Sequence, residues 1–231
     1  MNIAVILAGG TGARIGGELP KQFLLVNHKT IMEYTIEAFE HHPEIDSIYI
    51  VCKQEYIDFV KNIVTTNQYS KIAGVIPGGR ERYESSIAAI HAIKDCHSNI
   101  LLHDCARPLV SKRIIHDCIE ALKHHEAVSV AVKTTDTIYM SNEKNEIVMI
   151  PERSVLRNAQ TPQCFRYPII KKAYESAKSD LQFKPTDDCS VVMKYLPQTP
   201  IFIVEGETTN IKITYKEDIK FFEEMLQRKM D

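Results

Sequence analysis

The chain has 231 residues, of which 44% are hydrophobic and 25% charged, a composition typical of a soluble globular protein with one domain over 1–231. Its 28 basic and 30 acidic residues give a formal net charge of -2, which excludes a strongly basic surface for nucleic acid or a membrane. No apolar run approaches the roughly 18 residues of a membrane-spanning helix, and the six cysteines form no C-x-x-C pair. We therefore expect a cytoplasmic protein without a structural zinc site.

Apolar runs of strand length alternate with segments of helical period in the first part of the chain. The predicted strands lie at 3–7, 47–52, 72–76, 99–103 and 128–132, and the predicted helices at 30–40, 56–64, 81–93 and 112–123. This alternation predicts an α/β fold, with a mostly parallel, twisted sheet covered by helices on both faces.

The alternation breaks at 134–150, where two short polar strands, 137–141 and 146–150, flank a turn at 142–145. This pattern predicts a β-hairpin. It is either a protruding arm that contacts a partner subunit or an edge hairpin folded on its own sheet. Helices near 169–177 and 189–193, strands at 201–204 and 211–214, and a closing helix to Met230 are expected to follow.

A glycine-rich loop follows the first strand, from Ala8 to Gly17. Glycines let backbone N–H groups approach phosphate oxygens, and ligands of open α/β sheets bind beyond the carboxyl ends of strands. Arg14 and Lys21 add two cations that can neutralise a triphosphate. The alternative is a plain glycine-rich turn. A dinucleotide-binding fingerprint is excluded because Ile15 occupies its third glycine position. A Walker loop is excluded because Glu18, and not Lys, follows Gly17.

Two further strand ends carry groups suited to phosphate chemistry. Asp104 directly follows the strand at 99–103, and a carboxylate there suits Mg²⁺, which prefers hard oxygen ligands together with phosphate. Arg107 either binds a phosphate or pairs with Asp104. Lys212 falls in the predicted strand 211–214, where a cation among apolar residues needs an anion to meet.

Three weaker signals lie elsewhere in the chain. Gly79 belongs to a turn leading into a predicted helix, where the backbone and Ser85 could read a base edge. Thr161 follows the basic residue Arg153. Thr186 opens a helix, where an ordinary N-cap is the competing explanation.

Together these motifs resemble the cytidylyltransferases for 2-C-methyl-D-erythritol 4-phosphate and for D-ribitol 5-phosphate. The motifs that carry the resemblance span nearly the whole chain and occur in this order: Leu7-Ala8-Gly9-Gly10-x-Gly12-x-Arg14-x-Gly16, Pro20-Lys21-Gln22, Gly78-Gly79-x-Glu81-Arg82, His103-Asp104-x-x-Arg107-Pro108, Thr161-Pro162-Gln163, Thr186-Asp187 and Asn210-Ile211-Lys212-Ile213-Thr214. The resemblance implies a nucleotidyltransferase-type, Rossmann-like fold, Mg²⁺ as cofactor, CTP and a polyol phosphate as substrates, and a homodimer in which the arm at 134–150 reaches into the partner's site.

The resemblance also implies roles for individual residues. The catalytic cations would be Arg14, Lys21 and Lys212, and the magnesium ligand Asp104. The nucleotide would be bound by Ala8, Gly9, Gly10, Gly12, Gly79, Arg80 and Ser85, and the acceptor by Arg107, Thr137, Arg153, Thr161 and Thr186.

Some positions depart from the methylerythritol enzymes. Thr209 stands where those enzymes often carry Asp, which leaves Asn210 as a possible second metal contact. The segments 160–163 and 186–189 lean towards the ribitol enzymes. We therefore expect transfer of CMP from CTP to D-ribitol 5-phosphate, with 2-C-methyl-D-erythritol 4-phosphate as the alternative acceptor. Two competing hypotheses are a uridylyl- or adenylyltransferase for a sugar phosphate and a non-catalytic nucleotide-binding protein.

Overall fold

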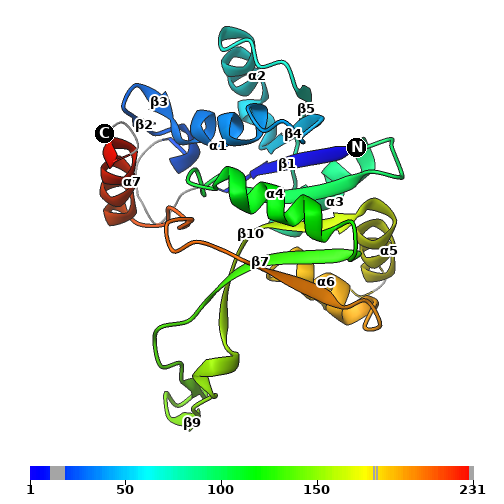
Figure 1. Cartoon of the computed structure of the whole chain (residues 1–231), viewed down its shortest axis with the longest axis vertical. Helices are drawn as coiled ribbons and strands as arrows, with labels where there is room; N and C mark the ends of the chain where they lie inside the picture. Colours follow the sequence, from blue (N-terminus) through cyan, green and yellow to red (C-terminus); the bar gives the residue numbers. More distant parts are fainter. Residues whose placement is uncertain (11–18, 179, 181, 229–231) are drawn as a thin grey trace.

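A sheet of seven strands forms the centre of the molecule (Figure 1). The structure is a computed structural model and describes residues 1–10, 19–178, 180 and 182–228. The strands are β1 (Asn2–Ala8), β4 (Ser47–Cys52), β5 (Ile72–Pro77), β6 (Asn99–Asp104), β7 (Ala127–Lys133), β10 (Arg157–Arg166) and β11 (Ile201–Glu205). Their order across the sheet is β11-β7-β10-β6-β1-β4-β5. Only β10 runs antiparallel to its neighbours, so the prediction of a mostly parallel sheet is confirmed.

Helices cover both faces of this sheet, as the alternation of apolar segments predicts. One face carries α1 (Ile31–Glu40), α2 (Ile57–Thr66) and α4 (Lys112–Ala121), and the other α3 (Arg82–Ala92), α5 (Tyr167–Ala177) and α6 (Asp188–Tyr195). Successive side chains of a strand point to opposite faces, so β1 contributes Ile6 to the first layer and Val5 to the second. Both side chains are fully buried.

Smaller elements complete the body of the fold. They are the 3₁₀ turns η1 (Lys21–Phe23) and η2 (Gln54–Tyr56), the short pair β2 (Leu25–Val26) and β3 (Lys29–Thr30), and the closing helix α7 (Lys216–Arg228). Phe222 of α7 packs in a third cluster with Ile31 and Ile213. No helix in the described part of the chain has the length and apolar character needed to cross a bilayer.

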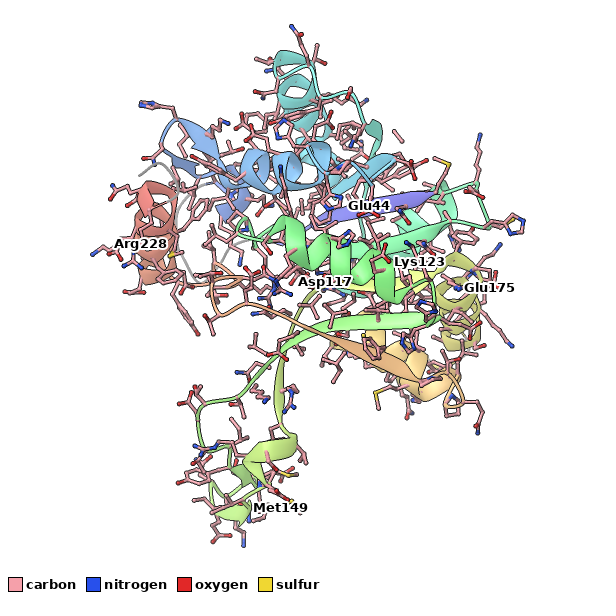
Figure 2. All side chains as sticks on the ribbon, in the orientation of Figure 1. Glu44, Asp117, Lys123, Met149, Glu175 and Arg228 are labelled. Carbon is pink, nitrogen blue, oxygen red and sulfur yellow. The ribbon has the colours of Figure 1, made fainter. Side chains whose placement is uncertain are left out.

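The predicted hairpin projects away from the body as an arm (Figure 1). We define the arm as residues 134–156, which contain β8 (Met140–Ser141), β9 (Ile147–Met149) and the turn η3 (Arg153–Val155). Met149 lies at its far end (Figure 2). The paired strands are shorter than predicted, so Thr137 lies before β8 and outside the ladder. The hairpin therefore projects from the body and is not folded on the edge of the sheet.

One strand is missing from the sequence-based prediction, and two predicted features of secondary structure are wrong. The long strand β10 was not predicted, because buried polar residues such as Gln160 and Gln163 interrupt its apolar pattern. The expected strand at 211–214 is irregular chain, joined to the body by one backbone bond from Ile213 N–H to Ala106 C=O (2.8 Å). The N-cap of α6 is Asp187, whose carboxylate accepts from the Ser190 N–H, and not Thr186.

Candidate active site

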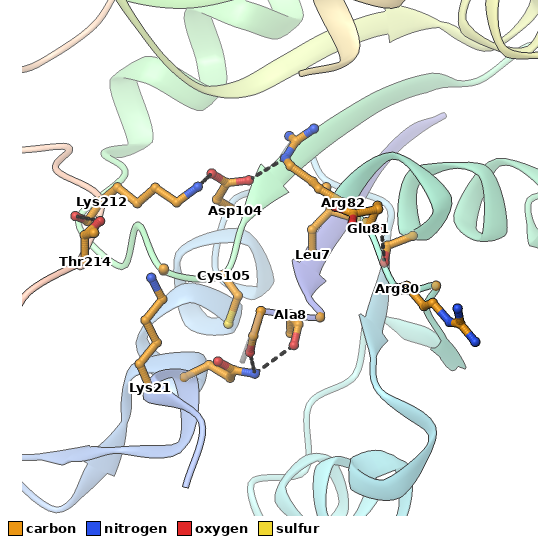
Figure 3. A pocket seen from close by; sticks show the side chains of 16 residues that line it. Leu7, Ala8, Lys21, Arg80, Glu81, Arg82, Asp104, Cys105, Lys212 and Thr214 are labelled. Carbon is orange, nitrogen blue, oxygen red and sulfur yellow. Dashed lines mark hydrogen bonds and ion pairs between the residues drawn. The ribbon is translucent and has the colours of Figure 1, made fainter. Parts of the chain in front are cut away.

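A pocket of about 350 Å³ opens at the carboxyl ends of β1 and β6, beside the start of α3 (Figure 3). β1 and β6 are parallel neighbours in which Leu7 lies opposite Asp104, so the residues that follow both strands reach the same edge of the sheet. This edge is where open α/β sheets bind ligands. The residues that line the pocket are Leu7, Ala8, Gly9, Gly10, Lys21, Gln22, Gly79, Arg80, Glu81, Arg82, Ser85, Asp104, Cys105, Ala106, Lys212 and Thr214.

Asp104 lies in this pocket between two cations (Figure 3). Its Oδ1 accepts from Arg82 Nε at 2.9 Å, and its Oδ2 accepts from Lys212 Nζ at 2.7 Å. Burial alone would raise the pKa of Asp104, but the charges of Arg82 and Lys212 outweigh it and hold that pKa well below its usual range. The carboxylate is therefore ionised throughout the neutral pH range.

Arg82 connects Asp104 to a second, fully buried carboxylate. Its Nη1 donates to Asp188 Oδ2 at 2.5 Å, and the Asp188 side chain is 0% exposed. The other oxygen, Asp188 Oδ1, accepts from the Tyr174 hydroxyl at 2.6 Å. Burial opposes the charged form of Arg82, but Asp188 and Asp104 together raise its pKa. Arg82 is thus a fixed cation.

Lys21 and Lys212 reach the pocket from opposite ends of the chain. Lys21 lies in η1, is largely buried, and donates from Nζ to the Ile213 carbonyl at 2.6 Å. Lys212 extends from the irregular segment after β11, and its side chain is 40% exposed. The prediction that Lys212 meets an anion is confirmed by its contact with Asp104, although the strand expected around it is absent.

The described residues that were predicted to hold the nucleotide line the same pocket. Ala8, Gly9, Gly10, Gly79, Arg80 and Ser85 all line it. Gln22 Nε2 donates to the carbonyls of Ala8 (2.8 Å) and Gly10 (3.0 Å), which fixes the chain beyond β1. A Cβ added at Gly9 would lie 3.3 Å from Ser85 Oγ, so the absence of a side chain there permits this close approach. Gly12 and Arg14 lie outside the described residues.

The residues predicted to bind the acceptor are not part of the pocket lining. Arg107 donates from Nη1 to the Asn210 carbonyl at 2.8 Å. Thr161 is buried, and its Oγ1 accepts from the Asp104 N–H at 3.1 Å, so it fixes the backbone at the end of β6. Thr186 is exposed near the start of α6.

The two predicted acceptor residues of the arm are not brought to the pocket either. Thr137 and Arg153 are both exposed. Arg153 Nη1 donates to the Thr135 carbonyl, a bond within the arm.

Asn210 does not face the pocket, which argues against its being a second metal contact. It is 0% exposed, and its Nδ2 donates to Gln160 Oε1 (3.2 Å) and to the Thr161 carbonyl (3.0 Å). Asn210 instead anchors the segment that carries Lys212.

Sequence reasoning missed Arg82 and Gln22 as site residues. Arg82 is the last position of the Gly78-Gly79-x-Glu81-Arg82 motif, and Gln22 the last of Pro20-Lys21-Gln22. A role for Arg82 could have been inferred because it opens a helix that follows a glycine turn. Its partner Asp188 lies 106 residues away and has no such local signal.

The donor set fits a divalent cation that is shared with a phosphorylated ligand. Asp104 offers hard carboxylate oxygens inside the pocket, and Mg²⁺ is usually bound by one or two carboxylates plus substrate phosphates. Lys21 and Lys212 supply positive charge for those phosphates. The arrangement can therefore bind a polyphosphate and a hard metal ion together.

Comparison with known proteins relates the chain to a family. The model of the IspD family, 2-C-methyl-D-erythritol 4-phosphate cytidylyltransferase, matches residues 2–228. The 2-C-methyl-D-erythritol 4-phosphate cytidylyltransferase of Thermobifida fusca is 40% identical over 230 residues, covering 97% of this chain and 92% of the relative. The bifunctional ribulose 5-phosphate reductase/CDP-ribitol pyrophosphorylase Bcs1 of Haemophilus influenzae is also 40% identical, over 98% of this chain and 48% of the relative.

A solved structure agrees with the sequence comparisons. The crystal structure of the 4-diphosphocytidyl-2C-methyl-D-erythritol synthase of Anaerococcus prevotii superposes with a TM-score of 0.85 at 31% identity. The match covers 98% of this chain and 96% of that one.

Proposed function

The chain belongs to the 2-C-methyl-D-erythritol 4-phosphate cytidylyltransferase family and is a nucleotidyltransferase, and we propose that it transfers CMP from CTP to a small polyol phosphate. The observation that supports this proposal is the pocket in which ionised Asp104 lies between Arg82 and Lys212, with Lys21 beside it. A non-catalytic nucleotide-binding protein has little need of a metal-binding carboxylate among phosphate-binding cations.

The reaction requires orientation and charge neutralisation more than proton transfer. A phosphate oxygen of the acceptor attacks the α-phosphorus of CTP, a new P–O bond forms, and the bond to the β-phosphate oxygen breaks to release pyrophosphate. The attacking phosphate is already ionised at neutral pH, so no general base is needed. Lys21 and Lys212 neutralise the charge that develops on the phosphates. We propose the same role for Arg14, based on its position in the glycine-rich sequence motif.

Asp104 is the proposed ligand of a divalent cation, for which we propose Mg²⁺. When bound, the ion would withdraw charge from the phosphate oxygens that it shares with Asp104. The protein's own part is to keep Asp104 ionised and oriented, which Arg82 does through its bond to Oδ1.

The nucleotide side of the pocket suits recognition by close backbone approach. A Cβ at Gly79 would collide with Glu84, and a Cβ at Gly9 would lie only 3.3 Å from Ser85 Oγ. We propose that the cytosine and ribose lie against Ala8, Gly9, Gly79, Arg80 and Ser85, and that the triphosphate extends past Gly10 towards Lys21. Gly12 is included among the nucleotide-binding residues on the basis of the sequence motif.

We propose D-ribitol 5-phosphate as the acceptor and 2-C-methyl-D-erythritol 4-phosphate as the second candidate. The residues at 160–163 and 186–189 support the first, as does a CDP-ribitol pyrophosphorylase among the relatives. The methylerythritol names of the Thermobifida relative and of the Anaerococcus structure support the second. Equal identity, 40%, to relatives of both kinds means that overall similarity does not separate the two acceptors.

A paired turnover assay tests the proposal. The purified protein is incubated with Mg²⁺, CTP and each acceptor in turn, pyrophosphate release is followed, and products are identified by mass. CDP-ribitol as the main product supports the first acceptor, and CDP-methylerythritol the second. Replacing CTP with UTP or ATP tests the base. Turnover with neither acceptor, or faster turnover with another nucleotide, contradicts the proposal.

The arm is proposed to join two copies of the chain. Its exposed large apolar side chains are Ile138, Tyr139, Met140, Ile147, Val148, Met149, Ile150 and Val155, and a patch of this kind on a projecting element is typical of a protein interface. In the proposed homodimer Thr137 and Arg153 of one arm meet the acceptor phosphate in the partner's pocket, together with Arg107, Thr161 and Thr186 near it.

Light scattering on a sizing column tests the dimer. We expect the wild-type protein to be a dimer and Ile147→Asp to be a monomer. The matched control is Leu25→Asp, which charges an apolar side chain of the body that is even more exposed than Ile147, 69% against 56%, and should stay dimeric. A monomeric wild-type protein, or a dimeric Ile147→Asp, contradicts the role of the arm.

A further inference from the structure

The two oxygens of Asp104 are held by cations of very different character. Oδ1 accepts from Arg82 and Oδ2 from Lys212, at 2.9 Å and 2.7 Å. In Figure 3 the two side chains approach the carboxylate from opposite sides. A divalent cation that binds Asp104 has to share or replace one of these partners, so the ease with which each can leave decides where the ion binds.

Arg82 cannot leave without exposing a second charge. Its guanidinium also pairs with Asp188, whose side chain is 0% exposed and is further bonded to the Tyr174 hydroxyl. The backbone N–H of Asp188 donates to Gln163 Oε1, which fixes the start of α6 against β10. Removing one member of a buried ion pair leaves the other uncompensated and is strongly unfavourable. Arg82 therefore stays on Oδ1.

Lys212 can leave at little cost. Its side chain is 40% exposed, against 24% for Arg82, so water can solvate the ammonium group when it moves away. The Asp104 side chain is only 11% exposed, but it keeps Arg82 as a partner. The backbone around it need not move, since Asn210 is anchored to Gln160 and Thr161 and Ile213 is bonded to Ala106. Only the flexible stem of Lys212 has to swing away.

We propose that Lys212 is an exchangeable partner of Asp104 Oδ2, which it occupies until a nucleotide and a metal ion bind, while Arg82, held by Asp188, stays bonded to Oδ1. In the nucleotide-free enzyme Lys212 occupies the oxygen that a divalent cation needs. A nucleoside triphosphate offers the ammonium group of Lys212 several competing anionic oxygens. The ammonium group therefore moves to the phosphates, and Oδ2 becomes available to the metal ion. The site is thereby built to take its metal together with the nucleotide. This inference rests on the proposed function, because it takes the polyphosphate to be the ligand that draws Lys212 away.

Binding of Mn²⁺ to the nucleotide-free protein, followed by electron paramagnetic resonance, tests the proposal. We expect Lys212→Gln to bind Mn²⁺ roughly three- to tenfold more tightly than the wild type, since it removes both the ammonium group that occupies Oδ2 and its positive charge. Lys212→Arg keeps a cation over Oδ2 and should bind as weakly as the wild type. Arg80→Gln removes a pocket cation that points away from Asp104 in Figure 3 and should also leave the affinity unchanged.

Asp104→Asn in the Lys212→Gln background identifies where the ion binds, and should abolish the gain. Unchanged affinity in Lys212→Gln, an equal gain in Arg80→Gln, or a gain that survives Asp104→Asn would each overturn the proposal. Circular dichroism confirms that each variant is folded. The measurement needs neither acceptor nor turnover, so its failure is distinguishable from failure of the proposed reaction, which the pyrophosphate assay reports.

Discussion

Replacing Asp188 with Asn perturbs the site without changing its shape. The amide keeps the size of the carboxylate and can still bond to Tyr174, but it removes the buried negative charge that faces Arg82 at 2.5 Å. Breaking a buried ion pair by removing one partner costs about 3–5 kcal/mol. Arg82 is 24% exposed and keeps Asp104 as a second partner, so we expect the lower end of that range, a loss of about 3 kcal/mol in the free energy of unfolding.

Urea unfolding followed by circular dichroism measures this loss, and a double-mutant cycle assigns it. Arg82→Gln alone leaves Asp188 buried and unpaired and should be at least as destabilising. The double variant Arg82→Gln/Asp188→Asn has no unpaired charge at this pair, so it should be more stable than the sum of the single losses predicts, by at least about 1 kcal/mol. A change below about 0.5 kcal/mol in Asp188→Asn, or strictly additive losses, would refute the reasoning.

Three further predictions concern the cations, the glycine turn and a buried histidine. Lys21→Met should lower kcat about 100-fold or more with little change in folding, because a cation facing the reacting phosphates is lost; steady-state kinetics and circular dichroism check this. Gly79→Ala should raise KM for CTP several-fold, since its Cβ would collide with the Glu84 side chain, whereas Gly10→Ala, with nothing within 4 Å, should not disturb the fold. Burial lowers the pKa of His42 below its unfolded value, so the unfolded state binds more protons and stability should fall as pH drops below about 6.5; urea unfolding at pH 7.5 and 5.5 should show this loss in the wild type and a smaller loss in His42→Gln, where buried His103, whose pKa is also lowered, remains.

The order of strands and helices could be predicted because the apolar period of each segment is a local property. Buried parallel strands such as β1 are continuous apolar runs, and their helices carry one apolar face. The position of the pocket could be predicted from the same order of elements, because Ala8 and Asp104 each stand at the carboxyl end of a parallel strand. β10 escaped prediction because its buried residues include Gln160 and Gln163, whose hydrogen bonds to other elements replace the apolar signal.

The contacts around Asp104 depend on long-range geometry that no local pattern encodes. Arg82 and Asp188 lie 106 residues apart, and Lys212 and Asp104 lie 108 apart. The sequence showed that Lys212 needs an anion but placed it in a strand, where burial was the assumed reason. The anion is present, yet the lysine is half-exposed, and that exposure is what makes its bond to Asp104 exchangeable.

Alternating charges along one line explain why the pocket needs Asp188 as well as Asp104. The order is Lys212, Asp104, Arg82, Asp188, so each inner charge is shared between two opposite neighbours. Without Asp188, the full charge of Arg82 would fall on Asp104 and weaken its attraction for a divalent cation. With Asp188 present, Arg82 and Asp188 balance each other once Lys212 moves to a phosphate, and Asp104 retains a negative charge. The buried pair of Arg82 and Asp188 therefore serves to orient Asp104 without neutralising it.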